Sequence, residues 1–178
     1  MATGFVLAGL ASLLLASQAT NPSGPHEVGL MTSVALMNGC VSSVARGRGL
    51  SDAFAGSRLE KVERPAGLPV EETDLEVWRM PYEGAQIFVY APSTDTSVCY
   101  VSVFGAKVED VAPSIRTLLK SADSPFVEGT TEQVPGTGAA MVTYSSQNPA
   151  LPLFLTLIAN SEADESVPSV QMALKRIQ

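Results

Sequence analysis

The sequence predicts an α+β protein, a two-layer sandwich in which helices cover mainly one face of an antiparallel sheet of about six strands. Apolar residues recur at helical spacing over residues 27–45 and 112–122. Several runs of strand-forming residues are joined by short turn signals, which force neighbouring strands to be antiparallel. The expected order of elements is α-βββ-α-βββ-α.

The first helix is expected over residues 27–45, where Val28, Met31 and Ala35 repeat with a helical period. Glycine at position 47 should end it. A short helix is expected to start after Ser51, which can act as its N-cap.

Two later segments also have helical spacing. A helix is expected to begin near Ala112, because Pro113 is tolerated in the first turn of a helix but not in its interior. A final helix is expected over residues 167–177.

The remaining segments alternate between strands and turns. Residues 60–74 are charged and interrupted by proline, which is typical of an extended segment followed by a loop. The expected strands cover residues 75–80, 85–90, 98–104, 126–134, 139–146 and 153–159.

A weak internal repeat relates the two predicted strand-strand-strand-helix units. Residues 113–120 align with residues 168–175 and share Pro, Ser, Leu and Lys at the same places. The alternative is that two unrelated runs share the residues that begin helices. The order of elements is similar to that of secretion-chaperone-like domains, a likeness of topology alone, which implies no function by itself.

The chain begins with features of a cleavable export signal. Residues 4–16 are apolar and uncharged, and small residues follow at Ser17 and Ala19, which fits signal peptidase cleavage. A buried N-terminal helix is the alternative. We therefore expect a signal peptide over 1–19, a flexible linker over 20–26, and a single domain over 27–178.

Charge and cysteine content bear on compartment and partners. The chain has 18 acidic and 11 basic residues, a net charge of −7 that argues against nucleic acid and anionic membrane surfaces. Cys40 and Cys99 are far apart and form no C-x-x-C motif, so we expect a structural disulfide in a periplasmic or secreted protein. It should tie the first helix to the inner face of the strand at 98–104.

The sequence offers little catalytic chemistry. Its single histidine, His26, falls in the expected linker, and the spacing typical of zinc ligands is absent from the sequence. We therefore assign no catalytic residue, no metal ligand and no cofactor, and expect that the protein is not an enzyme. A carboxylate-dependent hydrolase is kept as an alternative, with Glu83, beside Tyr82 and Trp78, as its first candidate.

The leading hypothesis is an exported, non-enzymatic binding protein, chaperone-like or adaptor, that holds another protein or an apolar ligand on its sheet face. It is expected to bind no nucleic acid and to have no stable membrane anchor after signal cleavage, and it could form a homodimer. A second alternative is an inhibitor or immunity-type protein that inserts a turn, at 81–84 or 135–138, into an extracytoplasmic enzyme. The candidate binding surface consists of Trp78, Tyr82, Phe88, Tyr90 and Tyr100.

Overall fold

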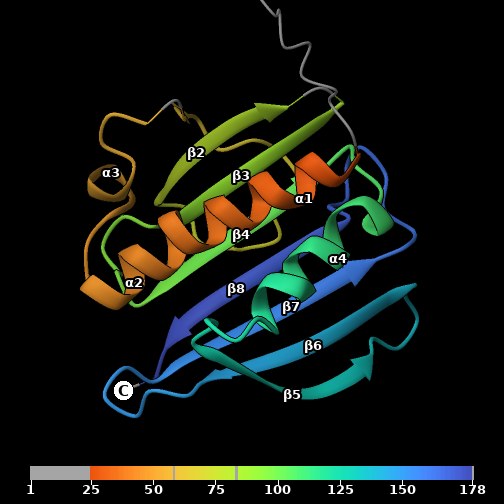
Figure 1. Cartoon of the computed structure of the whole chain (residues 1–178). Coiled ribbons are helices and arrows are strands. Elements are labelled where there is room, and N and C mark those ends of the chain that lie inside the picture. Colours follow the sequence, from red (N-terminus) through yellow and green to blue (C-terminus); the bar gives the residue numbers. More distant parts are fainter. Residues whose placement is uncertain (1–24, 58, 83, 178) are drawn as a thin grey trace, which may run out of the picture.

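The computed structural model describes residues 25–57, 59–82 and 84–177. The expected signal peptide and most of the expected linker lie outside the described residues. A single antiparallel sheet of eight strands, in the order β1-β2-β3-β4-β8-β7-β6-β5, carries the helices on one face (Figure 1). The strands are β1 Glu60–Val62, β2 Leu75–Tyr82, β3 Ala85–Pro92, β4 Val98–Phe104, β5 Phe126–Gln133, β6 Ala139–Ser146, β7 Leu153–Asn160 and β8 Val170–Arg176.

The first helix forms as the sequence predicts, with an internal change of period. It runs through α1 (Pro25–Val34), the π-helical η1 (Ala35–Val41) and α2 (Ser42–Arg46), and it ends at Gly47 in the left-handed conformation. By length and composition, residues 27–46 could cross a membrane. Here the inward side of this helix belongs to the core, where Leu36 and Val44 are fully buried.

A disulfide between Cys40 and Cys99 joins η1 to β4, as the sequence predicts. Both residues are fully buried, and the helix lies across the face of β4 that carries Cys99. Because disulfides persist in oxidising compartments, this bond is consistent with an exported protein.

The main core lies between the helices and the sheet. The two longer helices lie side by side, and they approach so closely that a Cβ on Gly29 would lie 2.7 Å from Ser114 Oγ. Beneath them, alternate residues of the strands are buried, for example Leu155 and Leu157 on β7. The short helix α3 (Leu50–Ala53) covers the edge of this core, and Phe54 directly after it packs on Trp78 with ring centroids 5.5 Å apart.

The expected final helix over 167–177 is wrong, because this segment forms strand β8. Val170, Met172 and Leu174 are buried while Gln171 and Ala173 are half-buried, so the segment follows a period of two. A segment of this length fits both periods, and tertiary pairing decides between them. β8 pairs with β4 on one side and with β7 on the other. The backbone N–H and C=O groups along these two strand edges therefore find hydrogen-bond partners.

Helix α4 (Val108–Leu119) begins earlier than expected. Pro113 lies inside this helix instead of in its first turn. The proposed repeat fails for a related reason, because it aligns part of α4 with residues that form β8. Together with the additional strands β1 and β8, these differences also end the likeness to the topology of secretion-chaperone-like domains.

A different symmetry is present in the sheet. Strands β1 to β4 form one antiparallel meander and β5 to β8 form another, and the two join through the central antiparallel pair β4–β8. The strand order is therefore the same from either edge, with β1 corresponding to β5, β2 to β6, β3 to β7 and β4 to β8. Each meander follows a helix in the chain.

Replacing both Cys40 and Cys99 by alanine should lower the free energy of unfolding by about 4 kcal/mol, because the loop of 59 residues gains freedom in the unfolded chain. Urea unfolding of the oxidised wild type and of the double variant measures the difference. A reductant should bring the wild type close to the variant and leave the variant unchanged. Equal stability of both oxidised proteins would contradict this role.

Candidate binding surface

The far face of the sheet, meaning the face opposite the helices, is covered in one half and open in the other. β3 is buried on both faces over residues 87–91, whereas β7 alternates strictly between buried and half-buried residues. The helices cover one face of both strands. The difference therefore arises on the far face, where β3 has a second cover.

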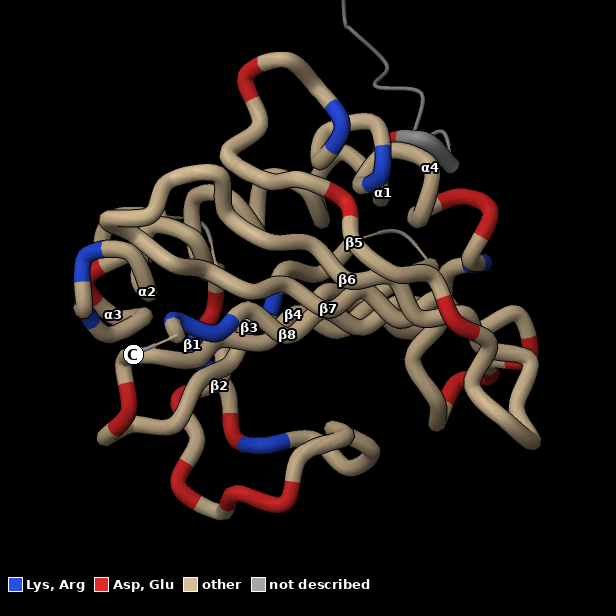
Figure 2. The backbone as a smooth tube through the Cα atoms, turned by 90° about the horizontal axis from the view of Figure 1, so that it is seen from below, with Lys and Arg blue, Asp and Glu red and all other residues tan. Residues whose placement is uncertain are grey.

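That cover is the connection between β1 and β2, residues 63–74, here called the strap. It passes below the sheet on the side away from the helices (Figure 2). Leu68 and Val70 of the strap belong to a second apolar cluster, separate from the main core. The strand residues that contribute to this cluster are Val62, Val77, Leu75, Phe88, Tyr90, Tyr100 and Phe104.

Two features hold the strap in place. The guanidinium group of Arg64 donates hydrogen bonds to the backbone carbonyls of Val70 and Glu72, which closes the strap on itself. Gly67 has φ +85° and lies so close to the β7–β8 loop that a Cβ would be 2.8 Å from the Ser166 carbonyl oxygen. A glycine is therefore required at this contact.

Aromatic side chains fill the space beneath the strap. The rings of Phe88 and Phe104 meet edge to face with centroids 5.7 Å apart, and those of Tyr90 and Tyr100 stack at 5.2 Å. The Tyr90 and Ser102 hydroxyls are hydrogen-bonded at 2.9 Å. Burial raises the pKa of Tyr90 to about 12, although the bond to Ser102 opposes the shift.

The structure divides the five aromatic residues of the expected binding surface between the two faces. Trp78 and Tyr82 pack against the main core on the helix side. Phe88 and Tyr90 lie on the far face and are buried beneath the strap, and Tyr100 is half-buried beside them. These five side chains therefore do not form one open surface, because successive strand residues point to opposite faces and the strap covers one of them.

The open half of the far face is formed by β6, β7 and β8. Its side chains are half-buried and form cross-strand rows, such as Met141–Ile158–Gln171 and Thr143–Thr156–Ala173. The two rows named are uncharged across β6, β7 and β8, whereas Lys175 pairs with Phe154 at one end of the surface and Glu132 of β5 pairs with Met141 at its edge. We call this surface the open floor, and it consists of Met141, Thr143, Phe154, Thr156, Ile158, Gln171 and Ala173.

A depression lies at one end of the open floor. It has a volume of about 660 Å³, and its lining consists of Phe154, Ile177, the two cations Lys175 and Arg176, and Asp95 and Ser97. Ile177 is 50% exposed. An apolar side chain of a ligand could therefore bury itself here against Phe154 and Ile177.

Acidic residues border the open floor on two sides. Figure 2 shows acidic residues in the loops below the sheet. Burial raises the pKa of Tyr100, and the nearby negative charge of Glu72 raises it further. Tyr100 is the cross-strand neighbour of Ala173. The exposed acids of these two loops are Glu63, Glu71, Glu72 and Asp74 in the strap and Glu162, Asp164 and Glu165 between β7 and β8.

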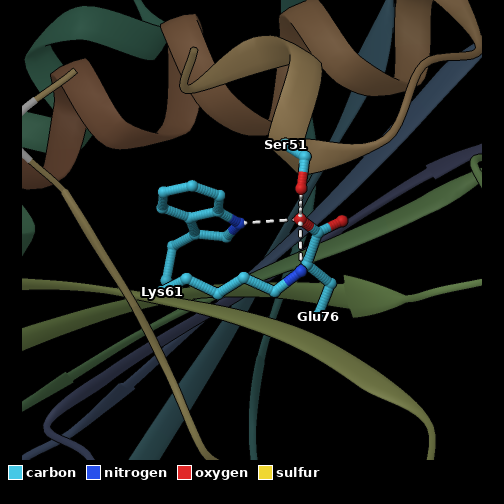
Figure 3. Close-up of polar contacts among 4 residues, drawn as sticks. Ser51, Lys61 and Glu76 are labelled. Carbon is cyan, nitrogen blue, oxygen red and sulfur yellow. Dashed lines mark hydrogen bonds and ion pairs between the residues drawn. The ribbon is translucent and has the colours of Figure 1, made fainter. Parts of the chain in front are cut away.

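A polar cluster of four residues lies on the helix side, around Glu76 (Figure 3). Its carboxylate accepts hydrogen bonds from the Ser51 hydroxyl and, at 3.0 Å, from Trp78 Nε1, and Lys61 Nζ lies at 3.4 Å. Burial alone would raise the pKa of Glu76, but these partners outweigh it and leave the pKa lowered. The cluster ties α3 to β1 and β2.

The surroundings of Glu76 suit a structural anion better than a catalytic acid. The general acid of a glycosidase needs a raised pKa, whereas the pKa of Glu76 is lowered. Glu83, the sequence-based candidate for a hydrolase, lies outside the described residues. Within the described ranges, no group of three or more His, Cys, Asp or Glu side chains could hold a metal ion.

Hydrogen bonds hold the turn at 135–138 at both of its ends. Val134 N donates to Ala139 O at 2.9 Å, and Ser161 Oγ donates to Gly138 O at 2.8 Å. The second bond links the turn to the β7–β8 loop. The other turn expected to insert into an enzyme, 81–84, includes residue 83, which the structure does not describe.

No family model, curated protein or solved structure matches this chain. The candidate binding surface is therefore assigned from the chain's own residues.

The strap accounts for the high pKa of Tyr90, and a pH titration tests this. Since the folded pKa is raised from 10 to about 12, the stabilising effect of neutral Tyr90 is fully present below pH 10 and is lost as the pH rises through 12. The ultraviolet difference between wild type and Tyr90→Phe should show this late titration. Leu68→Ala, which loosens the strap, should move it towards pH 10, and a wild-type midpoint near 10 would contradict the burial.

Proposed function

We propose that this protein is an exported, non-enzymatic binding protein, and that it holds a segment of another protein on the open floor. Export is supported by the buried disulfide and by the uncharged apolar run over residues 4–16. Binding is supported by the half of the sheet that has no cover of its own.

The contrast between β3 and β7 carries this proposal. Both strands are central to their meanders, and the helix layer covers one face of each. Only β3 has a strap on its other face, so Phe154 and Ile158 on β7 remain in contact with water. Covering an apolar side chain of this size contributes about 1–2 kcal/mol, which makes the open floor a favourable surface for a ligand.

The polar groups of the open floor also suit reversible binding. The Thr156 hydroxyl and the Gln171 amide can donate and accept hydrogen bonds without a charge. The third polar group, the Thr143 hydroxyl, is hydrogen-bonded to Thr130 of β5. Nucleophilic catalysis would require a base beside the nucleophile, and these three residues supply none. The open floor therefore supports binding better than the hydrolase alternative.

Site-specific photo-cross-linking in the native cell tests the proposal. A photoreactive phenylalanine analogue at Met141, within the open floor, should capture a partner. The same analogue at Leu30, a helix-side residue that is 58% exposed, should not. The adducts at Met141 should decrease several-fold in an Ile158→Asn variant, since these residues are direct cross-strand neighbours.

The Ile158→Asn variant should fold, because its side chain is only half-buried. Leu30→Asn serves as the matched control and should leave the adducts at Met141 unchanged. Adducts that form equally at Leu30 and Met141, or that persist in Ile158→Asn, would contradict binding at the open floor.

A further inference from the structure

We infer that the ligand of the open floor is an extended, cationic protein segment that covers this half of the sheet as the strap covers the other half. The inference rests on the proposed function and specifies the chemistry of the partner. Three observations lead to it: the symmetry of the sheet, the way the strap packs, and the charge around the open floor.

The symmetry of the sheet shows that the described part of the second meander lacks a counterpart of the strap. In the first meander, the strands β1 and β2 are joined by the strap, residues 63–74. The corresponding strands of the second meander, β5 and β6, are joined by a tight turn in which Val134 and Ala139 are hydrogen-bonded. Among the described residues, the β5–β6 connection of the second half is therefore too short to cross its far face as the strap does, and we infer that a segment of another chain covers it.

The strap also shows what kind of segment covers such a surface. Its apolar residues Leu68 and Val70 are two positions apart, and both pack on the sheet from an irregular, extended backbone. Their targets include aromatic side chains such as Phe88. On the open floor, Phe154, Ile158 and Met141 offer targets of the same class to a segment with the same spacing.

Charge distinguishes the partner from a second copy of this chain. The seven exposed acids of the strap and the β7–β8 loop form no ion pair with any described Lys or Arg. A second copy would bring a strap with the same Glu71, Glu72 and Asp74, and these would be repelled. A segment with lysine or arginine beside its apolar residues would instead be attracted to these acids.

A peptide derived from the strap provides the probe. It covers residues 65–73 and carries Glu71→Lys and Glu72→Lys, so it keeps the apolar spacing and reverses the charge. Titrated into the full mature protein, it should shift the amide resonances of the open floor, those of Ile158 and Ala173 among them. The unmodified acidic peptide should bind at least about ten-fold more weakly, because its charge is repelled by the rim.

Protein variants separate the contribution of the rim from general charge attraction. The variant Glu162→Gln, Asp164→Asn, Glu165→Gln should weaken binding of the lysine peptide about ten-fold. The matched control Glu27→Gln, Asp52→Asn, Asp123→Asn removes the same charge outside the two rim loops and should change binding less than about two-fold. Added salt should remove most of the difference between these two variants.

The outcomes distinguish this inference from the proposed function. Equal binding of the acidic and lysine peptides, or equal weakening by both triple variants, would overturn the cationic partner and leave the open floor as a binding surface. Resonance shifts confined to the strap and Tyr90 would mean that the peptide displaces the strap, which also overturns the inference. A dimer that masks the open floor at working concentration would overturn it in favour of a second copy.

Discussion

A sheet can bury apolar side chains on both faces only where something covers both faces, and this constraint shapes the whole molecule. Sheet residues alternate between faces, so each strand presents two sets of side chains to be covered. Here the helix layer covers the central strands on one face, leaving most of β5 exposed, and the strap covers half of the other face. The aromatic content of each half follows the cover: Phe88, Tyr90 and Phe104 lie beneath the strap, whereas threonine is frequent on the open floor.

The disulfide fixes the helix layer to the centre of this sheet. Cys99 is on β4, one of the two strands that join the meanders, and Cys40 is in the π-helical turn of the first helix. The same turn places Gly39 against the ring of Phe54, where a Cβ would clash. One short segment of helix therefore contacts both the central strand β4 and Phe54, at the edge of the core that α3 covers. Neither contact is on the far face, where among the described residues the cover is the strap alone.

The sequence allowed the near side of the fold to be predicted more fully than the far side. The first helix and the strands at 75–80 and 98–104 follow from local spacing, and the disulfide follows from two cysteines in a chain that is expected to be exported. Residues 167–177 satisfied both helical and strand periods, and only the open edges of β4 and β7 decide in favour of β8. This decision depends on tertiary pairing, which a single sequence does not display.

The five aromatic residues of the expected binding surface lie on two faces of the sheet for a physical reason. A cluster of large aromatic residues in a sequence suggests an exposed binding surface, whereas here Phe88 and Tyr90 are buried and Trp78 and Tyr100 are half-buried by their own chain. The signal for this was present in the strap, where Leu68 and Val70 stand between charged residues and prolines at alternating positions. An apolar pair in an otherwise polar loop indicates that the loop packs on something, and the nearest uncovered surface is the face that carries Phe88 and Tyr90.

Covalent labelling of the purified protein by a photogenerated carbene tests most directly whether the sheet is covered in one half only. The account predicts strong labelling of Met141, Phe154 and Ile158, and protection of Phe88 and Phe104, which are 5% and 8% exposed. Leu30 on the helix side, at 58% exposure, provides the internal standard for an exposed side chain. Equal protection of both halves, or labelling of Phe88 and Phe104 at the level of Ile158, would contradict it.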